Sequence, residues 1–82
     1  MAPDLVVEVD SPGHSLREVG AKVAAYLRHG VRLIWVARPN RRVVVDYAPG
    51  ASARTLGTEA TLNGDEVLPG FSYPLARLCE GI

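Results

Sequence analysis

Residues 4–36 change their hydrophobic period twice, and this change limits the folds open to the chain more than any other feature. Residues 4–10 (DLVVEVD) alternate with a period of two, which predicts a strand. Residues 15–29 repeat apolar side chains at helical spacing, and residues 31–36 (VRLIWV) form a mostly apolar run typical of a buried strand. The order predicts a β-α-β unit with two parallel strands and a right-handed connection.

The predicted first strand separates two kinds of side chain. Its alternation places Leu5, Val7 and Val9 on one face. The opposite face carries Val6 and the acidic residues, which are Asp4, Glu8 and Asp10. The acids of this strand therefore share one face. A turn at residues 11–13 (SPG) ends the strand.

The predicted helix carries signals at both ends. Ser15 and Glu18 form an S-x-x-E capping box, and Gly30 is a natural C-cap that follows basic residues in the last turn. The apolar stripe that should pack on the sheet consists of Leu16, Val19, Val23 and Leu27, with Tyr26 beside it.

After the β-α-β unit the chain predicts a hairpin and a short final helix. A turn at residues 39–40 leads into a strand at residues 43–47 (VVVDY), and Pro74 opens a helix through Leu75, Leu78 and Cys79. Two short extended pieces lie between them, around residues 54–56 and 60–62. Trp35 and Phe71 are most simply core residues.

The composition indicates one soluble domain of 82 residues, with 48% apolar and 22% charged residues. Nine basic and nine acidic residues cancel, so any DNA contact needs a local basic patch. The single cysteine, together with an N-terminus unlike a secretion leader, favours a cytoplasmic setting. No apolar stretch approaches the roughly 20 residues of a spanning helix, so we expect no membrane partner.

Strand spacing decides which of the acids can cooperate. Asp4 and Glu8 are separated by about 13 Å along the strand, too far for one metal ion, whereas Glu8 and Asp10 are separated by about 7 Å. Carboxylate oxygens of this kind suit Mg²⁺, which proteins hold through one or two carboxylates with water and substrate phosphate. The simpler alternative is that these acids face solvent.

Lys22 is the only lysine beside eight arginines. It lies on the flank of the helix, from where it could aim its ammonium toward the acids of the first strand. The alternative is an ordinary surface pair with Glu18, worth about 0.3–0.5 kcal/mol. We favour a functional role, because a compact ammonium acts as a point charge beside a metal-bound water where a planar guanidinium does so poorly.

Other polar residues carry weaker signals. Arg41 and Arg42, with Arg38 near them, form one local basic cluster that could contact phosphates, although a charged turn is the commoner explanation. His14 and His29 have no second histidine or cysteine at zinc spacing, so we assign neither.

The segment PDLVVEVDSPGHSLREVGAKVAAYLRHGVRLIWVARPNRRVVVDY resembles the C-terminal half of the Uma-two family, a bacterial family classed with PD-(D/E)XK restriction-endonuclease-like nucleases. The later LNGDEVLPGFSYPLARL is similar to the closing segment of that family, so the resemblance covers nearly the whole chain. It implies that Glu8 is the metal-binding acid and that Lys22 is the catalytic lysine, moved from the strand to the helix. The family's upstream acidic helix residue and principal PD aspartate have no counterpart here.

Together these features predict an α/β restriction-endonuclease-like core fragment over residues 1–82: a β-α-β unit, a β-hairpin and a short C-terminal helix. The expected function is Mg²⁺-dependent DNA cleavage by a truncated domain, weak or inactive alone, with Glu8 and Lys22 as catalytic residues. Glu8 and Asp10 would hold the metal. The alternative is a non-catalytic module that pairs with a second copy or another chain through an exposed sheet edge. A decaying gene product without a present role is the third possibility.

Overall fold

The computed structural model describes residues 3–10, 15–64 and 66–80 of the chain, and the side chains of Leu16, Cys79 and Glu80 are not described. In chain order its elements are β1 (Leu5–Val9), α1 (Leu16–Arg28), β2 (Leu33–Arg38), a 3-10 turn η1 (Pro39–Arg41), β3 (Val43–Tyr47), β4 (Arg54–Leu56), β5 (Thr61–Asn63), β6 (Ser72–Pro74) and α2 (Leu75–Glu80). This order confirms the predicted β-α-β unit, hairpin and final helix. None of the helices in these ranges is long and apolar enough to cross a membrane.

The main sheet has four strands in the order β1-β2-β3-β4. β1 pairs parallel to β2, with Leu5 opposite Leu33 and Val9 opposite Ala37. β3 and β4 then add antiparallel strands. The parallel pair is the one that α1 connects, as expected for a crossover unit. β1 is therefore an edge strand within the part of the chain that the structure describes.

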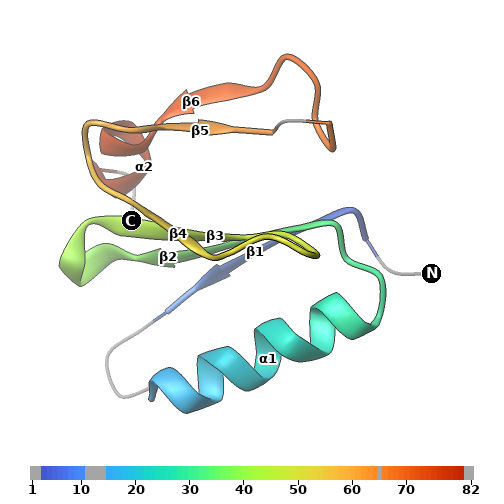
Figure 1. Cartoon of the computed structure of the whole chain (residues 1–82). Helices are drawn as coiled ribbons and strands as arrows, with labels where there is room; N and C mark the ends of the chain where they lie inside the picture. Colours follow the sequence, from blue (N-terminus) through green and yellow to red (C-terminus); the bar gives the residue numbers. More distant parts are fainter. Residues whose placement is uncertain (1–2, 11–14, 65, 81–82) are drawn as a thin grey trace.

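The two faces of the sheet are covered by different elements, so β2 is buried on both faces (Figure 1). α1 covers one face through a buried apolar cluster of Val19, Val23, Val31, Ile34 and Val36. The β5-β6 hairpin and α2 cover the other face through a second buried cluster of Leu33, Trp35, Ala37, Val44, Leu62 and Leu75. Burial on both faces explains why β2 has apolar residues on both faces instead of an alternating pattern.

α1 begins and ends at the predicted positions. The Ser15 hydroxyl accepts a hydrogen bond from the Glu18 N–H at 3.1 Å, as an N-cap does. At the other end His29 is the C-cap and Gly30 follows with φ of +93°. The Gly30 N–H donates to the Leu27 carbonyl and the Val31 N–H to the Tyr26 carbonyl, which is a Schellman motif. Glycine adopts this positive φ without the steric cost that a side chain would add.

The C-terminal part contains an element that the sequence did not predict. β6 pairs antiparallel with β5, so Leu62 lies opposite Tyr73 in a separate two-stranded sheet. Trp35 is buried, as predicted, and its ring centroid lies 5.6 Å from that of Phe71. Phe71 itself remains 37% exposed, so it borders the core rather than filling it. The prediction that Phe71 is a core residue was therefore confirmed only in part, since it contacts a core ring but stays partly exposed.

Candidate functional site

Glu8 is placed by β1 on the face of the sheet that α1 covers. It shares that face with Val6, which packs against the α1 cluster, and it lies opposite Val36 of β2. The alternation of β1 therefore separates the acidic side chain from Leu5, which packs on the opposite face. The side chain of Glu8 thus lies between its own strand, β1, and the helix α1.

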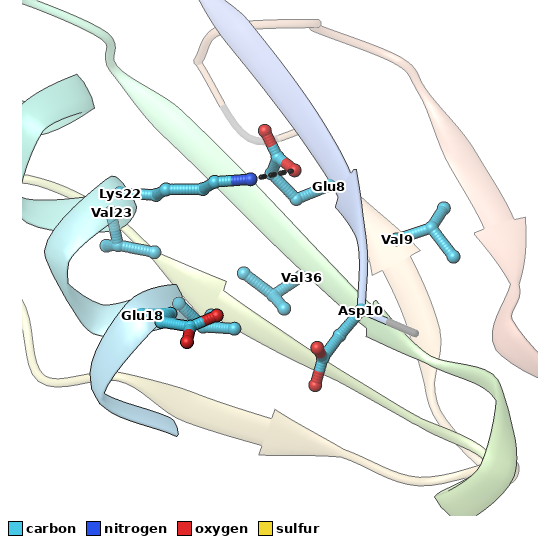
Figure 2. A pocket seen from close by; sticks show the side chains of 8 residues that line it. Glu8, Val9, Asp10, Glu18, Lys22, Val23 and Val36 are labelled. Atoms are coloured by element: carbon cyan, nitrogen blue, oxygen red, sulfur yellow. Dashed lines mark ion pairs between the residues drawn. The ribbon is translucent and has the colours of Figure 1, made fainter. Parts of the chain in front are cut away.

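Two side chains of α1 meet the Glu8 carboxylate, one at each oxygen. The Tyr26 hydroxyl donates a hydrogen bond of 2.6 Å to Oε1, and Lys22 Nζ lies 4.0 Å from Oε2. Lys22 and Tyr26 are four residues apart on the helix, so they lie on one face of it. The close-up shows the Lys22 side chain reaching from α1 toward Glu8 on β1 (Figure 2).

Within this group, Glu8 changes the titration of Tyr26. The hydrogen bond to Glu8, followed by desolvation and by the carboxylate charge, raises the pKa of Tyr26 above its usual value of 10.0. A hydrogen bond of 2.6 Å to an oxygen anion has the length of a charge-assisted bond. Tyr26 therefore remains a neutral donor that fixes one carboxylate oxygen, while the other faces the ammonium.

Tyr26 is the residue of this site that sequence analysis missed. It was interpreted as a neighbour of the apolar stripe, and its ring does pack against the α1 cluster. A tyrosine hydroxyl that is partly buried needs a polar partner. A tyrosine beside the apolar stripe therefore predicted that a polar group lies nearby. Which partner it meets depends on the distance between α1 and β1, and no local pattern encodes that distance.

Asp10 follows the end of β1 and is held by β2. Its N–H donates to the Ala37 carbonyl at 2.8 Å, and its Oδ2 lies 3.5 Å from Nε of Arg38. Both side chains of this ion pair are largely buried. Arg38 therefore neutralises Asp10 and does not contribute to the basic cluster expected at the hairpin turn.

A small pocket of about 70 Å³ joins these groups. Its polar lining comes from Glu8, Asp10, Glu18 and Lys22, and its floor is apolar. Figure 2 shows the acids arranged around one hollow between β1 and α1. Lys22 forms its ion pair with Glu8 and not with Glu18, so the simple surface pair along the helix is absent from the described part of the chain.

The carboxylates of the pocket are the residues to test against a metal ion. No group of three or more metal-ligating side chains occurs in residues 3–10, 15–64 and 66–80. Mg²⁺ is commonly bound through one or two carboxylates with water and substrate phosphate. Glu8 and Asp10 line the same pocket and are the carboxylates that could supply such a set, although each is already paired, Glu8 with Tyr26 and Lys22 and Asp10 with Arg38.

The remaining expected residues lie outside this pocket. Arg41 belongs to η1 and Arg42 follows it with a left-handed φ of +53°, and both side chains are exposed at the β2-β3 turn. Neither lines the pocket around Glu8. His29 caps α1, and His14 falls outside the described residues.

Two comparisons with known proteins describe what the chain is similar to. The model of the Uma2 family, whose description is "Putative restriction endonuclease", matches residues 1–76. A crystal structure of a "putative nuclease belonging to DUF820" from Anabaena variabilis ATCC 29413 superposes with a TM-score of 0.85 at 22% sequence identity. The match covers 98% of this chain and 45% of the solved chain, so this chain spans less than half of that protein. At this identity the likeness shows the fold. None of the curated proteins matches the chain.

Proposed function

Because this chain belongs to the Uma2 family of restriction-endonuclease-like proteins, we propose that it carries part of a Mg²⁺-dependent site for DNA phosphodiester hydrolysis. The observation that carries this proposal is the meeting of Glu8 from β1 with Lys22 from α1 at 4.0 Å, around one pocket. Acid and ammonium come from different elements, so their approach is a tertiary arrangement. The nuclease type that we propose for this site is PD-(D/E)XK.

Glu8 is the proposed metal-binding acid, and Asp10 is the second carboxylate of the site. Tyr26 orients Glu8 by holding Oε1, which leaves Oε2 directed toward Lys22. When bound, Mg²⁺ would supply Lewis-acid polarisation of the phosphodiester. The role of Tyr26 is positioning, since its hydroxyl acts through the carboxylate.

Lys22 is the proposed partner for the negative charge of the scissile phosphate. Its side chain is 59% exposed, so the ammonium is open to an incoming anion while its stem rests beside the pocket. The charge on a phosphate grows on the non-bridging oxygens during attack, and a placed cation stabilises it there. An ammonium presents that charge as a point, without the fixed plane of a guanidinium.

Arg41 and Arg42 are proposed to contact the DNA backbone away from the pocket. Both are exposed at the turn that follows β2, and the carboxyl ends of the parallel strands β1 and β2 meet at the same edge of the sheet. Asp10 lies at that edge as well. Contacts of this kind contribute affinity without sequence preference and weaken as salt rises.

The isolated chain is proposed to be weak or inactive as a nuclease. Its pocket offers one or two carboxylates, and no group of three or more metal-ligating side chains occurs among the described residues. Residues 1–82 would then act as a truncated single domain that needs further ligands.

Magnesium binding and DNA cleavage test the proposal separately. Calorimetric titration of the purified chain with Mg²⁺ should show binding that Glu8→Gln removes and Arg28→Ala retains, since Arg28 is exposed on α1 outside the pocket. Equal binding in all three proteins would contradict the metal site. Robust cleavage of plasmid DNA with Mg²⁺ that is lost in Lys22→Ala would contradict only the proposed inactivity.

A second candidate function is a pairing module that retains the nuclease fold without catalysis. The observation in its favour is the edge strand β1, on which Val7 and Val9 are 52% and 51% exposed. Exposed edges of this kind are templates for added strands. Light scattering tests this candidate, because a strict monomer at high concentration would exclude it.

A further inference from the structure

The connection between β3 and β4 is built on a tight turn. The Ala51 N–H donates to the Ala48 carbonyl at 3.2 Å, and Gly50 has a φ of +74°. Proline at the second position of a turn and a glycine of positive φ at the third are the features of type II, and Pro49 and Gly50 occupy these positions. The turn brings Ala48 and Ala51 close together at the end of the strand pair.

A cavity of about 490 Å³ lies beside this turn. The residues that line it are Asp46, Ala48, Ala51, Ser52 and Arg54. Asp46 shares a face of β3 with Val44, which belongs to the buried cluster under the β5-β6 hairpin. Glu8 faces α1 on the opposite side of the sheet, so this cavity is separate from the candidate metal site.

The two carboxylate oxygens of Asp46 have different surroundings. Asp46 is only 5% exposed and lies directly opposite Arg54 of β4. Its Oδ2 accepts a hydrogen bond from Nη2 of Arg54. Its Oδ1 is shielded from solvent and accepts no hydrogen bond from any described residue. A buried carboxylate oxygen without a donor is costly, so Oδ1 requires a donor that the described chain does not supply.

The charges beside the cavity disfavour an ion as the missing group. Arg54 balances the charge of Asp46, so a metal cation would meet a guanidinium as well as a carboxylate. An anion would meet the Oδ1 oxygen of Asp46. A neutral molecule with an N–H or O–H donor has neither conflict.

Arg54 adds a second requirement for the missing group. Its side chain is 62% exposed and lines the cavity, and a guanidinium carries several N–H donors in one plane. A ligand that fits both residues therefore has a donor for Asp46 beside an acceptor for Arg54. The N–H and C=O groups of a cyclic amide lie side by side in one plane, so a cyclic amide meets both requirements.

We propose that this cavity binds the cyclic-amide edge of a thymine-type base. The ring N–H donates to Oδ1 of Asp46, and the carbonyl beside it accepts from Arg54. The methyl groups of Ala48 and Ala51 offer apolar surface to the ring. Guanine fits less well, because its additional amino donor would need Oδ2 of Asp46, which Arg54 already occupies. The volume lies within the range of small-molecule sites.

Titration with thymidine tests the site directly. In nuclear magnetic resonance spectra of the ¹⁵N-labelled chain, thymidine should shift the amide signals of Ala48, Ala51 and Ser52 and reach saturation. 3-Methylthymidine is the matched ligand, since it differs only by a methyl group in place of the ring N–H. Its affinity should be at least about tenfold lower, because a hydrogen bond to a charged group is lost. Equal shifts with both ligands, or none with thymidine, would overturn the proposal.

Two pairs of variants place the binding in this cavity. Ala51→Leu fills the cavity and leaves the pair of Asp46 and Arg54 intact, so it should abolish the thymidine shifts. Ala53→Leu is its control, since Ala53 is an exposed alanine of the same connection outside the cavity lining. Asp46→Asn, checked for folding by its spectrum, should weaken thymidine binding about tenfold or more. Full binding by folded Ala51→Leu or Asp46→Asn protein would contradict the site.

The remaining comparisons identify the source of the base and separate this site from the proposed nuclease. A thymidine octanucleotide that binds more tightly per base than thymidine indicates an unpaired base within a strand, and equal affinities indicate a free nucleoside. Glu8→Gln should bind thymidine with unchanged affinity, because Glu8 lies on the other face of the sheet. Loss of thymidine binding in folded Glu8→Gln protein would refute a separate site. Absence of Mg²⁺ binding would affect only the nuclease proposal.

Discussion

Tyr26 donates a hydrogen bond of 2.6 Å to Glu8 across the contact between α1 and β1. The bond joins residues 18 positions apart and holds one oxygen of the carboxylate, while Lys22 lies at the other. A single acid of the edge strand is thus positioned by two side chains of one helix. These two contacts give the Glu8 carboxylate a defined orientation.

This hydrogen bond predicts how Tyr26 titrates. Because the pKa of Tyr26 is raised above 10.0 in the folded chain, the stabilisation that the bond supplies is complete below about pH 10. It is lost as the pH rises through the higher folded-state pKa. Absorbance titration of tyrosinate should therefore show a late component that Tyr26→Phe removes. In Glu8→Gln the same component should shift back toward the usual pKa, and an unchanged titration in that variant would refute the assignment.

Removing Lys22 should change stability very little. The ion pair with Glu8 is 4.0 Å long and involves a lysine that is 59% exposed, so we expect Lys22→Ala to cost about 0–1 kcal/mol in the free energy of unfolding. Urea denaturation measures this cost. A loss of Mg²⁺-linked or DNA-linked function in a variant that unfolds normally would then reflect the site. A much larger destabilisation would show that the ion pair is structural.

Removing the partner of the buried acid in β3 should destabilise the fold more than removing Lys22. Asp46 is only 5% exposed, and Arg54 of β4 reaches over to its Oδ2. Arg54→Ala leaves a buried carboxylate without this partner, which should cost about 1–3 kcal/mol in denaturant unfolding. Arg54→Lys, which retains the charge, should recover part of the loss. Identical stability of the alanine and lysine variants would argue that the charge of Arg54 is irrelevant.

The start of α1 offers a local test. The Ser15 hydroxyl accepts from the Glu18 N–H, so Ser15→Ala should cost about 1 kcal/mol of stability. Ser15→Asp should be tolerated, because aspartate caps equally well and its charge suits a helix N-terminus. Thermal unfolding followed by circular dichroism measures both variants. If the two variants unfold at the same temperature, the cap contributes nothing.

Much of the fold could be predicted from local patterns. The alternation of residues 4–10 correctly separated the face of Glu8 from the face of Leu5, and the unbroken apolar run at β2 indicated a strand buried on both sides. The cap at Ser15 and the glycine at residue 30 marked the ends of α1. These signals are readable because burial and backbone hydrogen bonding act within one element. β6 was missed, since Ser72–Pro74 is short, exposed and stabilised by its pairing with β5.

In the candidate site, too, some features could be predicted from the sequence and others could not. The sequence by itself determined that Glu8 and Asp10 share a face and that Lys22 lies on the flank of the helix, because strand and helix periods dictate side-chain direction. Only the tertiary structure decided that Lys22 pairs with Glu8 rather than with Glu18. It also decided that Tyr26 donates a hydrogen bond to the same carboxylate and that Arg38 forms an ion pair with Asp10. Those partners depend on how closely α1 and β2 pack against β1. That spacing follows from the apolar side chains of the whole core and from no segment alone.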